Sequence, residues 1–130
     1  MIITSQIPIK NLSQDDLKVM NEAAQVYNAI LEHLCHTNNQ SQQHIHHSIL
    51  YGYRRMIAQR FTRRNIPIRN TLNLEVYQAF VAFDSLMLFQ DKTDNQLKKV
   101  KANKISNEIY EELPQAKDLN WLSINSHMIK

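Results

Sequence analysis

The clearest pattern in the chain extends from Ser13 to His36 and reads SQDDLKVMNEAAQVYNAILEHLCH. Ser13 followed by Asp15 and Asp16 is typical of a helix start, because a hydroxyl and nearby carboxylates satisfy free backbone N–H groups. Apolar side chains then recur at alternating spacings of three and four residues, which places them on one helix face. The residues of this face are Leu17, Met20, Ala24, Tyr27, Leu31 and Leu34. The segment predicts a long amphipathic helix that other elements must cover.

Three more helices are expected, each preceded by a polar break. The second extends from about Gln42 to Arg64, the third begins near residues 70–73 and ends near Gln90, and the fourth extends over about residues 95–113. The third is apolar nearly all round, which is typical of the central helix of a bundle or of an oligomer interface. The buried side of the second helix is expected to hold Ile45, Ile49, Tyr53, Ile57 or Met56, and Phe61.

The only glycine, Gly52, falls inside the second predicted helix. Glycine there costs about 1 kcal/mol relative to alanine. A close helix crossing or an approach of the backbone to a ligand would offset this cost, and we favour the crossing.

Composition and length indicate one mainly helical domain. The chain has 130 residues, of which 43% are hydrophobic, with one glycine and three prolines. So few turn formers disfavour sandwiches and barrels. We expect an all-α bundle of four to five helices over residues 1–130, with an N-terminal arm at 1–12, core helices at 13–90 and a helical extension at 91–130. The first ten residues are either a strand or an extended arm, and the segment around Trp121 is either a short helix or a strand.

Positive charge is concentrated between His33 and Leu74. This stretch holds five of the six histidines and every arginine of the chain but no aspartate or glutamate, although the formal net charge of the whole chain is only +3. A segregated positive field attracts polyanions, whereas the alternative is an ordinary solvated helix face. Guanidinium groups on a helix and the following loop suit successive phosphate oxygens. The arginines are Arg54, Arg55, Arg60, Arg63, Arg64 and Arg69. Tyr51 and Tyr53 lie beside the first two and are candidates for stacking on bases, although the spacing of Tyr53 is that of a core residue.

Metal binding and catalysis have little support in the sequence. His44, His46 and His47 lie close together and His33 and His36 have helical spacing, but Cys35 is the only other typical ligand nearby. We expect these histidines to be structural or solvent-facing. We find no phosphate-binding glycine loop, nucleophile elbow or paired carboxylates, so we expect no enzyme activity, no cofactor and no metal.

The expected cellular setting is a reducing, cytoplasmic one. A single cysteine forms no internal disulfide, no apolar run approaches the length of a membrane span, and the N-terminus lacks a leader pattern.

Three stretches carry a resemblance to a known family. They are Thr4-Ser5-Gln6-Ile7 with the following Lys10-Asn11-Leu12-Ser13, the basic segment from Ile45 to Arg64, and Val76-Tyr77-Gln78-Ala79-Phe80-Val81-Ala82-Phe83. In this order the chain resembles the small, all-helical subunit of type III-A CRISPR effector (Csm) complexes over about residues 4–88. It departs from the family pattern at Pro8 and Gln78, where the family has Arg and Glu, and in the extra length of residues 89–130.

The resemblance implies a non-catalytic antiviral-defence subunit that lines the crRNA–target RNA duplex, contacts its backbone, and associates with other subunits and with copies of itself. It implies phosphate contacts at Lys10, Arg54, Arg55 and Arg60, whereas Arg63, Arg64 and Arg69 are candidates from charge alone. Two other functions stay open. One is a helical interaction module, such as a phage inhibitor or an antitoxin-like partner, that uses the apolar third helix. The other is a small RNase, which we consider last.

Overall fold

The computed structural model describes residues 6–38, 41–61 and 68–113, including their side chains except those of 34–38 and 41–47. In this part of the chain four helices accompany a small two-stranded sheet. Their order is β1 (Ile7–Leu12), α1 (Gln14–Asn38), α2 (Ser41–Phe61), β2 (Asn70–Leu74), α3 (Val76–Lys92) and α4 (Gln96–Glu112). The prediction of a mainly helical bundle with a short N-terminal strand is confirmed. The segment around Trp121 lies outside the described residues.

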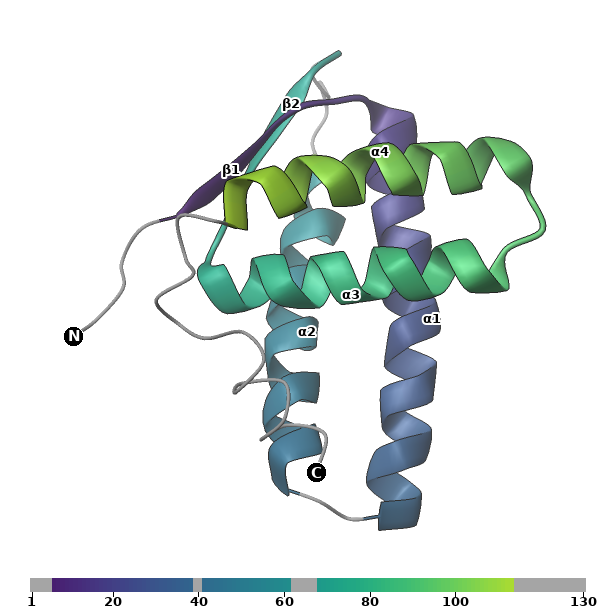
Figure 1. Ribbon diagram of the computed structural model, residues 1–130. Coiled ribbons are helices and arrows are strands. Elements are labelled where there is room, and N and C mark those ends of the chain that lie inside the picture. The colour runs from purple at the N-terminus through teal and green to yellow at the C-terminus, as the bar shows by residue number, and fades with distance from the viewer. Residues whose placement is uncertain (1–5, 39–40, 62–67, 114–130) are drawn as a thin grey trace.

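The four helices form two hairpins that cross (Figure 1). Helices α1 and α2 lie side by side as one hairpin, and α3 and α4 form a second hairpin that crosses the first at a steep angle. The crossing covers the half of the first hairpin that is remote from the α1–α2 connection, and the sheet lies beside it. The hairpin of α1 and α2 therefore keeps much of its surface uncovered by α3 and α4.

The sheet is antiparallel and contains a β-bulge. Ile7 pairs with Leu74 and Ile9 with Leu72, but the register then shifts so that Leu12 pairs with Asn70. Two residues of β1, Lys10 and Asn11, therefore lie opposite one residue of β2, and Asn11 adopts a positive φ of 60°. The extra residue returns Leu12 to the buried face, which explains why the apolar residues of β1 do not alternate strictly.

The prediction that the third helix begins near residues 70–73 is wrong. Residues Asn70–Leu74 form β2, and α3 begins only at Val76. The side chains of this segment alternate between buried and exposed, with Leu72 and Leu74 fully buried. In a strand, side chains alternate between the two faces, so both leucines reach the core while the backbone forms hydrogen bonds to β1. An extra turn of helix at these residues would provide neither the burial of both leucines nor the pairing with β1.

The predicted helix start at Ser13 is confirmed. The backbone N–H of Asp16 donates to Ser13 Oγ over 3.0 Å, and the backbone N–H of Ser13 donates to Asp16 Oδ2 over 2.9 Å. This reciprocal pair satisfies two donors at the N-terminus of α1. Helix α4 begins in a similar way, because Asn95 Oδ1 accepts a hydrogen bond from the Lys98 backbone over 3.1 Å.

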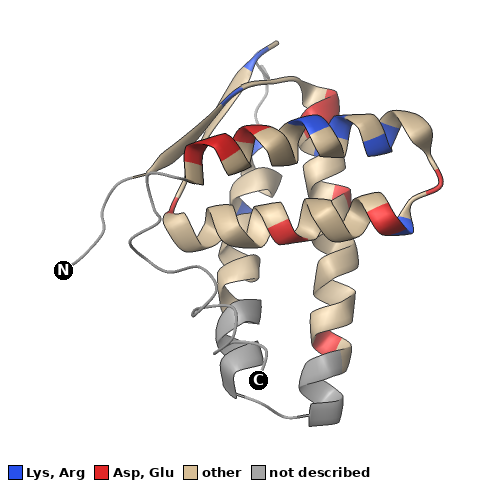
Figure 2. Ribbon diagram, in the orientation of Figure 1, with Lys and Arg blue, Asp and Glu red and all other residues tan. Residues whose placement is uncertain are grey.

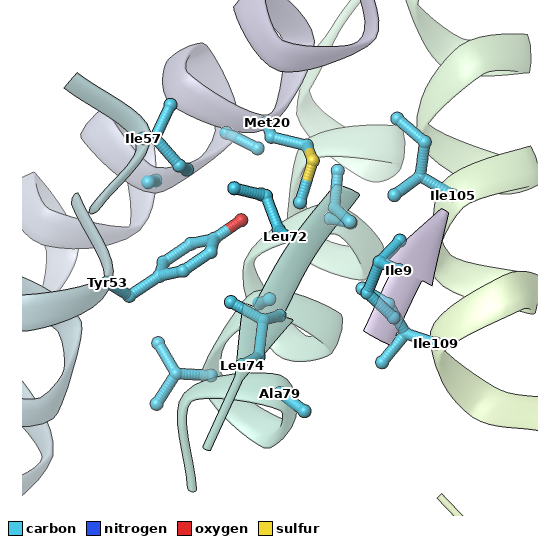
Figure 3. Close-up of a cluster of buried hydrophobic side chains, with 14 of the residues drawn as sticks. Ile9, Met20, Tyr53, Ile57, Leu72, Leu74, Ala79, Ile105 and Ile109 are labelled. Carbon is cyan, nitrogen blue, oxygen red and sulfur yellow. The ribbon is translucent and has the colours of Figure 1, made fainter. Parts of the chain in front are cut away.

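All six elements contribute to one hydrophobic core. Figure 3 shows Tyr53 extending from α2 toward Leu72 of β2, with Ile9 and Ile109 on the far side of that strand. Helix α3 is the central helix, since it packs against α1, α2, α4 and β2. Helix α4 belongs to the same core through Ala102, Ile105 and Ile109. The predicted stripe of α1 is buried or half-buried from Leu17 to Leu31, whereas the side chains of Leu34 and Ile45 are not described.

In the residues that the structure describes, no helix combines the length and the apolar character needed to cross a bilayer.

Candidate nucleic-acid interface

Helix α2 presents different chemistry on two of its faces. Leu50, Tyr53 and Ile57 are fully buried in the core. A second stripe follows the spacing i, i+3, i+4 and i+7, which is one helix face turned away from the first. Its residues are Tyr51, Arg54, Arg55 and Ala58. Tyr51 is therefore available to a partner, with 56% of its surface exposed, whereas Tyr53 is not.

This second face borders a surface hollow between α1 and α2. The hollow has a volume of about 330 Å³ and is lined by Tyr51, Arg54, Arg55 and Ala58 from α2 and by Asn21 and Gln25 from α1. Asn21 and Gln25 are one helical turn apart, so both amides face the same side of α1. We call this feature the α1–α2 hollow. It brings two guanidinium groups, one phenol ring and two amides together, with no acidic residue in its lining.

The two arginines of the hollow are not neutralised within the described part of the chain. Neither forms an ion pair with a described carboxylate, and the Nε atom of Arg54 is buried without a hydrogen-bond partner. The guanidinium carbon of Arg55 lies 6.0 Å from the centroid of the Tyr51 ring, at the outer range of a cation–π contact. A buried N–H that lacks an acceptor is costly, so an incoming anion would relieve the cost.

The remaining predicted arginines lie elsewhere or outside the described residues. Nη2 of Arg60 is 3.4 Å from the carbonyl oxygen of Thr71, a long hydrogen bond that joins the end of α2 to β2. Arg69 is exposed just before β2. Arg63 and Arg64 fall in the segment 62–67, which the structure does not describe.

Lys10 has a different environment from the arginines. It lies at the β-bulge and lines a surface hollow with Glu108, Glu111 and Glu112 of α4. The pKa of Glu108 is raised, mainly because burial disfavours the charged carboxylate. The Lys104 ammonium opposes this shift, and neighbouring carboxylates add to it. A polyanion is repelled by such a surface. The structure therefore gives Lys10 no place beside Arg54 and Arg55.

The lysines of α4 are partly used inside the fold. Figure 2 shows lysines along the first half of α4 and acids at its end. Nζ of Lys98 lies 2.8 Å from Oε1 of Glu22, and Nζ of Lys101 lies 3.9 Å from Oδ1 of Asp16, so both lysines join α4 to acids of α1. Their charges are thereby partly offset by carboxylates of the same chain.

Burial perturbs one acid near the centre of the molecule. It raises the pKa of Asp84 on α3 to about 7. Tyr27 of α1 is close enough to feel this carboxylate, because burial first and the charge of Asp84 second both raise the pKa of its phenol. Among the described side chains, no lysine or arginine forms an ion pair with Asp84.

Metal ligation has no geometric support among the described side chains. No group of three or more histidine, cysteine, aspartate or glutamate residues there is arranged to hold an ion. His33 is exposed on α1, whereas the side chains of Cys35, His36, His44, His46 and His47 lie outside the described set.

Sequence reasoning did not identify Asn21 and Gln25. Their helix places them opposite the arginines, but isolated amides on the polar face of a helix carry no distinguishing signal.

Comparisons of the chain with family models, with curated proteins and with solved structures give no match.

Proposed function

We propose that this protein is a non-catalytic RNA-binding protein that contacts the nucleic-acid backbone through Arg54 and Arg55 of α2. The observation that carries the proposal is the α1–α2 hollow, where both guanidinium groups border an opening that contains no acid. Phosphate oxygens suit these groups because a guanidinium donates two parallel hydrogen bonds to an anion of matching geometry.

The neighbouring charges favour the same partner. The described acids of α4 lie around Lys10, and two acids of α1 pair with lysines of α4. The hollow is thus a place in the described chain where two positive charges lie together without an acidic neighbour in the lining. Backbone contacts of this kind orient a nucleic acid without reading its sequence.

The biological setting that we propose comes from the resemblance in the sequence. It is a cytoplasmic antiviral-defence complex of the CRISPR type III kind, in which the protein contacts the guide–target RNA or another nucleic-acid backbone together with other subunits and copies of itself. Within that setting, Arg54 and Arg55 remain the phosphate contacts, with Arg60, Arg69 and the undescribed Arg63 and Arg64 as additional positive charges. Of the phosphate contacts that the resemblance implies, the one at Lys10 has the least support, because three glutamates line a hollow with this lysine.

The rival interaction module has less support. It requires the apolar side chains of the third helix to face a partner, but α3 buries Val76, Phe80, Val81, Leu86 and Phe89 in the core of its own chain. Of its large apolar residues, Tyr77 and Met87 are the exposed ones.

Binding of fluorescently labelled RNA across a salt series tests the proposal. We expect the affinity of the wild-type protein to fall steeply with salt, because phosphate neutralisation releases counterions. The double variant Arg54→Gln/Arg55→Gln should bind several-fold more weakly. Its slope of log K against log salt should be smaller by about 1.4, at about 0.7 for each lost contact to a single strand.

A matched control keeps the total charge equal. Lys99→Gln/Lys104→Gln removes two positive charges from α4, where neither lysine has a described ion pair, and should leave the affinity close to the wild-type value. Equal losses in both double variants would show attraction by net charge alone. Binding that does not respond to salt or to the arginine substitutions would refute the proposal.

A further inference from the structure

We infer that the α1–α2 hollow holds one unpaired nucleobase, stacked on Tyr51, with the adjoining phosphate at Arg54 and Arg55. The inference rests on the proposed function and specifies the form of the nucleic acid that the hollow binds, namely a single-stranded nucleotide. It also assigns roles to Asn21 and Gln25 on the opposite wall.

The ring of Tyr51 is the first support. A tyrosine on a soluble helix hides its ring where it can, but this ring is 56% exposed and borders the hollow. The next tyrosine along the helix, Tyr53, is fully buried, so of these two rings only that of Tyr51 is open to a partner. Stacking of a base on an exposed aromatic ring tolerates any sequence, because every base has a π-face.

The position of the charges is the second support. Arg55 lies 6.0 Å from the ring centroid and Arg54 occupies the same helix face, so a base on the ring would place its own phosphate within reach of a guanidinium. Among the described residues the Arg54 guanidinium has no ion-pair partner and its buried Nε atom has no hydrogen-bond partner, so a turn of the guanidinium toward the hollow would let its N–H groups bond to such a phosphate. A ring and cations in this combination are typical of single-strand binding surfaces.

The amides form the third support. Asn21 and Gln25 line the opposite wall of the hollow, and each side-chain amide offers donors and an acceptor. Exposed edges of an unstacked base carry the same mixture, so these side chains can use both their donors and their acceptor on a base, whereas a phosphate would use only the donors. The hollow, at about 330 Å³, lies at the lower end of the range of ligand pockets, which suits one nucleotide.

A paired base does not fit this arrangement. Inside an A-form helix both faces of a base are covered by its neighbours, and a protein reaches only the backbone and the shallow minor groove. A ring that is to stack therefore needs a base from a single strand, a bulge or an end. The hollow accordingly predicts a preference for unpaired over duplex RNA at equal numbers of phosphates.

The experiment compares two oligonucleotides of equal length and charge, a single-stranded oligoadenylate and the same strand with abasic sugars. We expect the wild-type protein to bind the base-bearing strand about ten-fold more tightly, since stacking contributes about 1–3 kcal/mol per base. In the Tyr51→Leu variant, which keeps apolar bulk without a ring, this ratio should fall toward one. Tyr51→Phe should retain it.

Two further measurements separate the possible failures. Circular dichroism melts of each variant establish that the fold is kept, and Asn21→Ala/Gln25→Ala should weaken the base-bearing strand more than the abasic one. Salt-dependent binding of both strands with equal affinity, unchanged in Tyr51→Leu, would overturn the inference and leave the proposed function standing. Failure of both strands to bind would overturn the inference and the proposed function together.

Discussion

Asp84 allows a quantitative test of the core of this structure. Its carboxyl group is largely buried on α3, it lies near the Tyr27 phenol, and no described lysine or arginine forms an ion pair with it. Burial raises its pKa from 3.8 to about 7. We predict that Asp84→Asn, which removes the charge and keeps the shape, stabilises the protein above pH 7.

The sign follows from proton linkage. The folded protein holds the Asp84 proton more tightly than the unfolded chain, so between about pH 4 and pH 7 the folded state binds more protons. The free energy of unfolding of the wild type therefore falls as the pH rises through this window. A pKa difference of about three units corresponds to about 4 kcal/mol at most, at about 1.36 kcal/mol per unit. Because proteins relax around buried charges, we expect about half of that.

The assay is urea unfolding of both proteins at pH 4.5 and pH 8, followed by circular dichroism. The variant should be more stable than the wild type by about 2 kcal/mol at pH 8, and the difference should fall to about 1 kcal/mol at pH 4.5, where the Asp84 carboxyl is protonated in the folded protein but still mostly ionised in the unfolded chain. Other titrating groups cancel between the two proteins. Asp91→Asn, at an exposed position of the same helix, serves as the control and should change stability little. Equal differences at both pH values, or a variant that is less stable at pH 8, would refute the reasoning.

Three other substitutions test local features. Gly52→Ala should raise the free energy of unfolding by about 1 kcal/mol, because alanine is the better helix former and the new Cβ would meet Gln78 Nε2 at an ordinary contact distance of 3.6 Å. A lower melting temperature in the variant would mean that the α2–α3 crossing needs glycine. Tyr53→Phe should leave the free energy of unfolding in urea unchanged or raise it by about 1 kcal/mol, because the buried hydroxyl has no hydrogen-bond partner among the described residues. A variant less stable by more than about 1 kcal/mol would show that the hydroxyl is bonded. Asn11→Val should cost about 1–2 kcal/mol, since φ at this position is 60°, while Asn11→Gly should be tolerated.

Local sequence patterns predicted the helices well. The stripe of α1 and its capping residue Ser13 depend only on neighbours a few positions away, and they appear as expected. Strand β2 was missed because five residues with two asparagines resemble a helix start as much as a strand. What decides between them is pairing with β1, which is remote in the sequence.

In the candidate site, too, the features that depend on nearby residues were predictable and those that depend on remote segments were not. The concentration of arginines was visible in the sequence, and two of them border the α1–α2 hollow. The opposite wall, Asn21 and Gln25, required knowledge of how α1 packs beside α2. The surroundings of Lys10 were not predictable for the matching reason, since the glutamates that line a hollow with it belong to a helix near the other end of the described chain.

The pairing of β1 with β2 has a consequence for synthesis on the ribosome. The apolar residues of β1, Ile7, Ile9 and Leu12, emerge early, but their partners Leu72 and Leu74 follow only after both helices of the first hairpin have been made. During that interval α1 and α2 can form from local contacts, while β1 exposes apolar side chains and unpaired backbone groups. Nascent chains that end before β2 are therefore the stage most exposed to aggregation and chaperone capture.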